Sequence, residues 1–287
     1  MLKTILIGNP ASGAGRLIGA LELPGHWVRD PSRIDADACL DADLIALFGG
    51  DGTVQKTVSS LLATIPCPQL PPVAVLPFGT TNMTAANLNC SRSRAAAVRS
   101  LRWMIEHEQL TLQSRPLLRI VHGEVTEHGF FFGLGAIATA VQAWNQDRRA
   151  APLRNRLRSA AAVLQGLRTA NASHPIAMNG SELDLYALLT TTLDRLLLGC
   201  RPYWGEALAG PLRMTWIDAG TPNLLARAPA LLRGSPRMAQ RAGFHSSSPA
   251  RVQLGLNGPF ILDGEIKDPQ SNELTVTATQ PLKWVTL

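Results

Sequence analysis

Short apolar runs alternate with helix-compatible stretches over roughly the first 115 residues. The runs at 4–7, 44–48 and 73–76 are continuous and rich in Ile, Leu and Val, as expected for strands that are buried on both faces. Helix-compatible stretches such as 95–107 separate or follow them. Alternating strands and helices are typical of βαβ units, so this pattern predicts an α/β domain with a doubly wound, mostly parallel sheet.

The pattern changes beyond residue 115. Apolar, β-branched runs then follow one another with turn-like spacing, and they lie at 117–121, 129–132, 183–192, 212–217, 252–256 and 274–279. Their β-branched content favours an antiparallel β-sandwich over helices. We therefore expect an α/β domain over 1–115 and a β-sandwich domain over 116–280, with the longest loop at 220–249, which is rich in Arg, Pro, Ser and Gly.

Polar, glycine-containing loops follow the three strands predicted in the first domain. They are Gly8–Arg16, Gly49–Thr53 and Pro77–Asn82. Because the carboxyl ends of parallel strands meet at one edge of a sheet, three such loops together predict a binding site there.

The loop Gly49-Gly50-Asp51-Gly52-Thr53 is the most informative of the three. Glycines lack a Cβ, so their N–H groups can approach phosphate oxygens, and the helix expected from Val54 adds the positive end of its dipole. Asp51 would then be an anion among phosphates, which requires an intervening cation such as Mg²⁺ or a hydrogen-bond donor. The alternative is a tight turn in which Asp51 caps a helix.

Four motifs together resemble the diacylglycerol kinase catalytic family, which includes bacterial lipid kinases and sphingosine kinases. They are NPASG at 9–13, GGDGT at 49–53, PFGTTN at 77–82 and LDGE at 262–265, and their order and spacing fit over nearly the whole chain. The GGDG core alone also occurs in NAD kinases. The resemblance implies a nucleotide-binding first domain, an acceptor-binding β-sandwich, and a tail at about 281–287 that returns to the first domain.

Two departures from the family pattern affect the expected chemistry. Gln55 and Lys56 stand where the family usually has an Asn–Glu pair, so an acidic side chain is replaced by a basic one. Met83 and Thr84 replace a common Asp–Phe pair. Both changes are compatible with phosphate binding by the backbone, but they leave open a catalytically weak, nucleotide-binding regulatory protein.

The function implied by the resemblance is an ATP-dependent lipid kinase that requires Mg²⁺. It would transfer the γ-phosphoryl group to a hydroxyl of a diacylglycerol-like or other lipid acceptor. An NAD kinase-like enzyme is the alternative within enzymes. Asp51 would carry the metal-linked charge, and the expected nucleotide-binding residues are Asn9, Ser12, Gly13, Arg16, Gly49, Gly50, Asp51, Gly52, Thr53, Thr80 and Asn82.

Asp263 and Glu265 are the candidate catalytic carboxylates of the second domain. They flank the flexible Gly264, so both can point to the same side, and an acceptor hydroxyl needs a carboxylate to take its proton. The resemblance assigns the base to one of these two. We favour Asp263, with Glu265 as a positioning or metal-linked partner. The alternative is an ordinary Asp-Gly hairpin turn.

Two further segments have both a lipid-related interpretation and a structural one. The aromatic pair Tyr203 and Trp204, in the loop 199–206, would line a lipid groove or pack inside a turn. The arginine-rich segment 148–168 would form a basic helix that contacts an anionic membrane, or a solvated helix that covers a domain.

Composition narrows the class of protein. The 287 residues, 46% of them hydrophobic, suffice for two cores. No run approaches the roughly 18–20 apolar residues of a spanning helix, and Met1 to Lys3 lead directly into a strand without a signal peptide. We expect a cytoplasmic protein, with peripheral contact at the inner membrane face if the basic helix binds lipid.

Nucleic-acid and zinc binding are not expected. The net charge is +6, but no zinc-finger or RNP-like pattern accompanies the arginines. The four cysteines follow no ligand spacing, so we expect buried thiols. We place the histidines on the surface or in loops, and they are His26, His107, His122, His128, His174 and His245.

Overall fold

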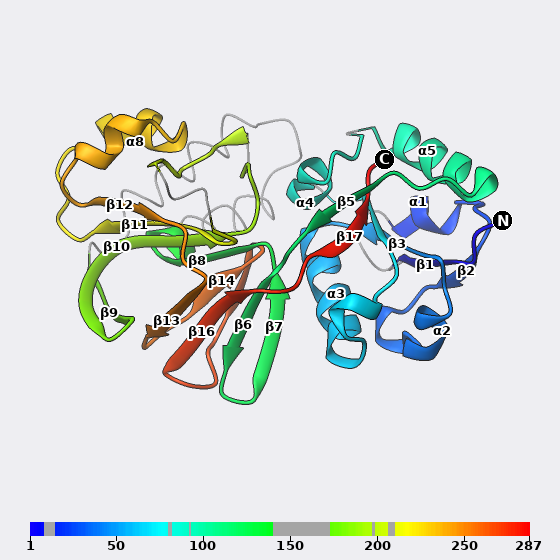
Figure 1. Ribbon diagram of the computed structural model, residues 1–287, viewed down its shortest axis with the longest axis horizontal. Helices are drawn as coiled ribbons and strands as arrows, with labels where there is room; N and C mark the ends of the chain where they lie inside the picture. The colour runs from blue at the N-terminus through cyan, green and yellow to red at the C-terminus, as the bar shows by residue number, and fades with distance from the viewer. Residues whose placement is uncertain (9–14, 80–81, 92, 140–172, 197–198, 206–209) are drawn as a thin grey trace. The chain divides into compact units, whose positions relative to one another are not determined.

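The structure is a computed structural model that describes residues 1–8, 15–79, 82–91, 93–139, 173–196, 199–205 and 210–287. The chain divides into two compact units. Unit 1 comprises residues 1–117 and 279–287, and unit 2 comprises residues 118–278 (Figure 1).

Unit 1 is built on a six-stranded sheet in which all neighbouring strands are parallel except the last pair. The predicted strands at 4–7, 44–48 and 73–76 lie next to one another, so the doubly wound, mostly parallel sheet is confirmed. In spatial order the strands are β2 (His26–Val28), β1 (Thr4–Gly8), β3 (Leu44–Gly49), β4 (Val73–Pro77), β17 (Leu282–Val285) and β5 (Leu112–Arg115).

Helices cover both faces of this sheet. In Figure 1, α1 and α5 lie on one side of the strands and α2 and α3 on the other. The three central strands β1, β3 and β4 are buried along their whole length, which explains their continuous apolar sequences. The helices are α1 (Gly15–Gly19), α2 (Ala36–Leu40), α3 (Asp51–Thr64), α4 (Met83–Asn87) and α5 (Arg94–His107), with short 3-10 turns at η1 (Pro31–Arg33) and η2 (Cys67–Gln69).

The C-terminal residues complete this sheet. Strand β17 pairs in parallel with β4 and antiparallel with β5. Trp284 is fully buried, and its indole N–H donates to the Arg115 carbonyl at 3.0 Å. A large aromatic side chain with its polar group satisfied fixes the end of the chain in unit 1.

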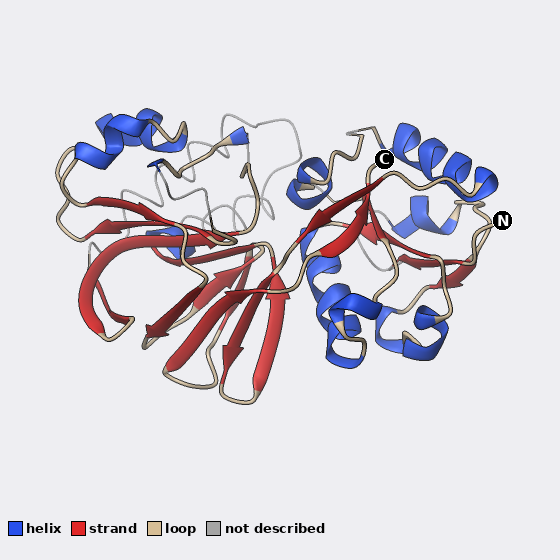
Figure 2. Ribbon diagram, viewed as in Figure 1, coloured by secondary structure: helices blue, strands red, loops and turns tan. Residues whose placement is uncertain are grey.

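Unit 2 is a curled antiparallel sheet, for which eleven strands are described, and its halves enclose one core, as in a β-sandwich (Figure 2). Phe132, Leu188, Val252, Phe260 and Val276 lie in that core. The main path is β15 (Glu265–Lys267), β14 (Phe260–Leu262), β8 (Phe131–Gly135), β10 (Ser181–Thr191), β9 (His174–Met178), β13 (Arg251–Gly255), β16 (Glu273–Ala278), β6 (Leu118–His122) and β7 (Val125–Gly129), while β11 (Arg213–Asp218) joins β10 and β12 (Phe244–Ser247) joins β11.

The sequence analysis predicted a long loop at 220–249, and this prediction is wrong. This segment contains α8 (Leu224–Leu232), the 3-10 turn η5 (Pro236–Gln240) and strand β12 (Figure 2). Its apolar side chains pack on a second core cluster of Trp204, Ile217, Met238 and Phe244. The Pro, Ser and Gly residues suggested a loop, whereas Leu224, Ala230 and Leu231 between them are partly buried on one side of a helix.

The placement of the histidines on the surface or in loops is also wrong for two of them. His122 on β6 and His128 on β7 are only 3% and 6% exposed. Burial lowers the pKa of His128 to about 4, with Arg119 contributing in the same direction. His128 is therefore neutral at pH 7 and behaves as a core side chain.

The arginine-rich segment 148–168 lies outside the described residues. Among the helices that the structure does describe, none combines the length and apolar character required to span a bilayer.

Candidate active site

The Gly-Gly-Asp-Gly-Thr motif forms the junction between β3 and α3. Gly49 ends the strand, Gly50 is the N-cap residue and Asp51 is the first residue of the helix. The Asp51 carboxylate does not cap its own helix. It accepts hydrogen bonds from the backbone N–H groups of Met83 at 3.2 Å and Thr84 at 2.8 Å, in the first turn of α4. Asp51 therefore caps α4, the helix that follows PFGTTN, and not the helix that its own motif begins.

Asn82 explains why α4 needs an acceptor from elsewhere. This residue precedes α4 with φ 50° and ψ 40°, and its side chain gives no cap to α4. Its Oδ1 instead accepts from the Gly79 N–H at 2.8 Å, and its Nδ2 donates to the Gly79 carbonyl at 3.0 Å. Asn82 thus closes the PFGTTN loop on itself, and Asp51 supplies the missing acceptor.

The glycines of the two motifs allow close approach of the loop backbones. A Cβ placed on Gly79 would lie 2.3 Å from the Cα of Gly50, and one on Gly50 would lie 3.0 Å from the Cα of Gly79. A Cβ on Gly49 would lie 2.6 Å from the Cβ of Thr53. Close backbone packing therefore requires these glycines.

Arg94 is a residue of this region that the sequence analysis missed. From the start of α5, its Nε donates to the Pro77 carbonyl at 3.1 Å and its Nη2 to the Gly79 carbonyl at 3.2 Å. The guanidinium also lies over the Phe78 ring, 5.6 Å from its centroid. A positive charge in the first turn of a helix interacts unfavourably with the helix dipole. An arginine at the expected start of this helix was therefore the one feature of the sequence that indicated a specific role.

The remaining expected nucleotide-binding residues divide into two groups. Gly52 and Thr53 lie in the first turn of α3, and Arg16 lies in α1. The others, Asn9, Ser12, Gly13 and Thr80, lie outside the described residues.

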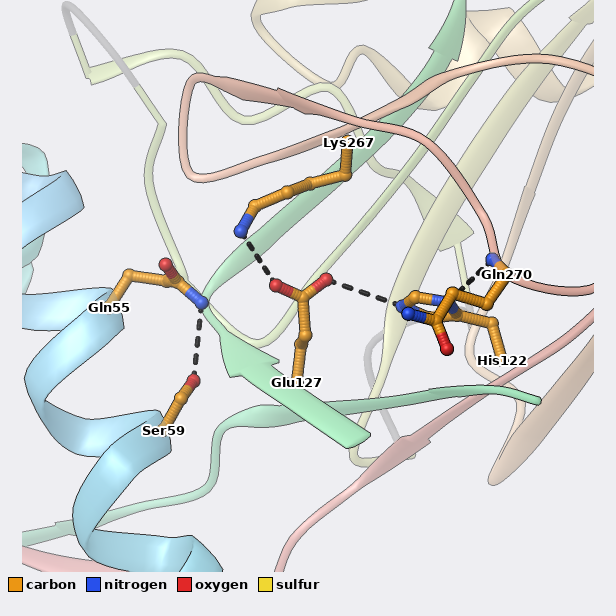
Figure 3. A network of polar contacts seen from close by, with 6 residues as sticks. All are labelled: Gln55, Ser59, His122, Glu127, Lys267 and Gln270. Atoms are coloured by element: carbon orange, nitrogen blue, oxygen red, sulfur yellow. Dashed lines mark hydrogen bonds and ion pairs between the residues drawn. The ribbon is translucent and has the colours of Figure 1, made fainter. Parts of the chain in front are cut away.

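The two residues that depart from the family pattern differ in burial. Gln55 is 3% exposed, and its side-chain amide donates to the Ser59 hydroxyl at 3.2 Å within α3 (Figure 3). Lys56 is exposed. Among the described residues no three His, Cys, Asp or Glu side chains gather as a metal site.

Asp263 lies in the turn between β14 and β15. Asp263 and Gly264 have φ values of 48° and 88°, as the hairpin alternative requires. The Asp263 carboxylate is 8% exposed and accepts from the Phe130 N–H at 3.0 Å to each oxygen and from the Phe131 N–H at 2.8 Å. Phe130 lies between β7 and β8, and Phe131 is the first residue of β8. The carboxylate therefore holds the β14–β15 turn against the connection from β7 to β8.

A polar network holds the same hairpin from its other strand. Figure 3 shows Lys267 of β15 directed at Glu127 of β7, with Nζ 2.6 Å from Oε1. Glu127 Oε2 lies 3.4 Å from His122 Nε2, and His122 Nδ1 accepts from the Gln270 N–H at 3.1 Å. Since Nδ1 is an acceptor, Nε2 carries the proton that faces Glu127. Asp263 and Glu265 therefore sit on a turn anchored at both strands.

The aromatic pair of the loop 199–206 is packed inside unit 2. Tyr203 and Trp204 are 4% and 5% exposed, and the Tyr203 hydroxyl donates to the Leu193 carbonyl at 2.8 Å. Trp204 belongs to the core cluster that also contains Phe244. Of the two interpretations offered by the sequence, the structure agrees with two rings packed inside a turn and not with a lipid groove.

Comparisons with solved structures show which known folds this chain resembles. Two solved structures from Bacillus anthracis str. Sterne, described as diacylglycerol kinases, one only provisionally, are 17% and 15% identical, with TM-scores of 0.68 and 0.66. The alignments cover 99% of this chain and 97% and 96% of those chains. A yeast NADH kinase complexed with NADH is 12% identical, with a TM-score of 0.50 over 100% of this chain and 84% of that one. At these identities the likeness establishes the fold.

A search of curated proteins found no match. The family model of the diacylglycerol kinase catalytic domain matches residues 25–111, which include β3, α3, β4 and α4. The resemblance inferred from the motifs is thereby confirmed, and residues 25–111 match the catalytic domain of diacylglycerol kinases.

Proposed function

We propose that the protein is an ATP-dependent lipid kinase that transfers the γ-phosphoryl group to a hydroxyl of a diacylglycerol-like or other lipid acceptor. Two connections carry the proposal: the close approach of Gly50 to Gly79 joins the GGDGT and PFGTTN motifs, and Asp51 joins GGDGT to the start of α4. They hold two strand-ending loops and the starts of α3 and α4 in one rigid arrangement. Phosphoryl transfer depends mainly on such positioning of phosphates.

The proposed nucleotide-binding residues are those of the three loops: Asn9, Ser12, Gly13, Arg16, Gly49, Gly50, Asp51, Gly52, Thr53, Thr80 and Asn82. In this proposal the backbone N–H groups at the start of α3 bind phosphate oxygens, helped by the helix dipole. The side chain of Asn82 maintains the loop that follows β4.

Asp51 is able to act as the proposed ligand of Mg²⁺. Its carboxylate accepts two N–H groups, and an ionised carboxylate has about four acceptor positions, so capacity for a cation remains. Mg²⁺ in kinases is commonly bound by one or two carboxylates together with substrate phosphates and water, so a single aspartate is sufficient. When bound, the ion would neutralise charge on the phosphates.

For the acceptor, we propose that Asp263 or Glu265 takes the hydroxyl proton, with Asp263 favoured. Variants separate catalysis from folding here, because the Asp263 carboxylate accepts backbone N–H groups whereas Glu265 is only half-buried. Asp263→Ala should lower the free energy of unfolding by about 1–3 kcal/mol, since it leaves two N–H groups without that acceptor. Urea unfolding measures this loss.

Glu265→Gln is the matched control for that prediction, and it should unfold like the wild type. If Asp263 is the base, Asp263→Asn loses phosphoryl transfer, whereas Glu265→Gln, which alters only the proposed partner of the base, loses less. Transfer by Asp263→Asn at the wild-type rate would exclude Asp263 as the base and leave Glu265 as the candidate.

The direct test of the proposed function uses wild-type protein. Calorimetry should detect binding of ATP in the presence of Mg²⁺, and labelled phosphate from γ-labelled ATP should appear in extracted lipids. NAD supplied in place of lipid should remain unphosphorylated. Labelled NADP without labelled lipid would favour the NAD kinase-like alternative, and the absence of nucleotide binding would exclude all of these functions.

A catalytically weak nucleotide-binding regulatory protein is the second candidate. Two observations favour it: both candidate carboxylates, Asp51 and Asp263, hold backbone N–H groups, and exposed Lys56 stands in place of the family's acidic residue. Nucleotide binding without any labelled product in the same assay would support this candidate over the kinase.

A further inference from the structure

A groove in unit 2 is lined by four arginines. It lies between α8 and η5 and has a volume of about 620 Å³. Arg227 and Arg233 come from α8 and its C-cap, and Arg237 and Arg241 come from η5 and the residue that follows it. The volume is in the range of sites that take small ligands.

Acidic residues are absent from the stretch of sequence that supplies these arginines. The sequence contains no Asp or Glu between Asp218 and Asp263, and Asp218 is engaged by His245, whose Nε2 lies 2.8 Å from the carboxylate. In the described parts of the chain, none of the four guanidinium groups forms an ion pair. Four like charges around one groove repel one another, and this repulsion is relieved when an anion binds among them.

The backbone of the groove is fixed. Gly234, at the turn between α8 and η5, has φ 66°, and a Cβ there would lie 2.3 Å from the Arg201 carbonyl oxygen. The Ser235 N–H donates to the Ala230 carbonyl at 3.0 Å, and Met238 is 2% exposed in the core cluster. The arginines therefore project from a rigid support, which lowers the entropy lost when a ligand binds.

One of the four side chains is also held in place. The Arg227 guanidinium lies over the ring of Phe244, 5.7 Å from its centroid. Phe244 itself is buried, so its ring cannot serve as a platform on which nucleic-acid bases stack. Guanidinium groups bind phosphate in a bidentate manner, and several of them favour a ligand with high phosphate charge.

From this arrangement we propose that the arginine groove of α8 and η5 binds a phosphate-bearing ligand, either a phosphorylated lipid headgroup or a free phosphorylated small molecule. The described residues that line the site all belong to unit 2, and none of them is among those proposed for nucleotide binding. It does not depend on the proposed kinase activity.

The test compares wild-type protein with Arg237→Ala/Arg241→Ala. Both side chains are exposed, so the double variant should unfold at the wild-type midpoint. Arg251→Ala is the matched control, because Arg251 is an exposed arginine of β13 that does not line the groove. One arm titrates the proteins with pyrophosphate, and the other sediments them with phosphatidylcholine vesicles that contain or lack phosphatidic acid.

Wild-type protein and Arg251→Ala should bind in at least one arm, and the double variant should bind about tenfold more weakly or worse, as expected when charged hydrogen bonds are lost. Binding in the pyrophosphate arm identifies a free ligand as sufficient, and binding only to vesicles with phosphatidic acid identifies a lipid headgroup. Hydrogen exchange should slow at 224–241. Equal binding by the double variant, no binding in either arm, or no protection at 224–241 would overturn the proposal.

Discussion

Gly79→Ala should destabilise unit 1 and abolish the proposed nucleotide binding. The added methyl would lie 2.3 Å from the Cα of Gly50 and 2.8 Å from Asn82 Oδ1. The first clash is with backbone and cannot be relieved by a rotamer change, so we expect a loss of about 1–3 kcal/mol or more in the free energy of unfolding. Separation of the loops would also move the start of α4 away from Asp51. Urea unfolding and ATP calorimetry measure the two effects.

Alanine substitutions at two other glycines serve as controls for this prediction. Gly19→Ala should behave as wild type, because the nearest atom to its Cβ is Arg29 Nη1 at 3.9 Å. Gly50→Ala should lie between the two, since its Cβ would be 3.0 Å from the Cα of Gly79. A Gly79→Ala protein that unfolds at the wild-type urea concentration would contradict the close contact of these loops.

The elements with clear periodicity were predictable from sequence. The continuous apolar runs predicted as strands are the buried strands β1, β3 and β4, and the helix expected at 95–107 is α5. The three polar loops follow parallel strands, so their common edge followed from topology. The prediction failed where composition and burial disagree, as in 220–249 and at His122 and His128.

The internal contacts of the site were not predictable. The Asp51 carboxylate binds N–H groups 32 and 33 residues further along the chain, and nothing local specifies these partners. The choice depends on Asn82, whose left-handed conformation turns its side chain to Gly79. Glycines that suit phosphate binding also suit close backbone packing, so the sequence alone could not separate the two causes.

Asp51→Asn should keep the fold and lose most phosphoryl transfer. Its amide oxygen can still accept from the Thr84 N–H, whereas the amide nitrogen would face the Met83 N–H, so the loss of stability should be modest. The lost negative charge removes the proposed metal ligand, and loss of such a preorganised group typically lowers kcat by about 10²–10³. A labelled-phosphate assay at saturating ATP and Mg²⁺ measures kcat, and urea unfolding measures stability.

Asp35 provides the matched control, because it has the same backbone role outside the site. Its Oδ1 accepts from the N–H groups of Asp37 at 3.0 Å and Ala38 at 3.4 Å, at the start of α2. Asp35→Ala and Asp51→Ala should each lose about 0.5–2 kcal/mol of stability as lost caps. Only the Asp51 variants should also lose transfer. If Asp35→Ala lowers kcat as strongly, the effect of Asp51 is structural, and its role as a metal ligand is rejected.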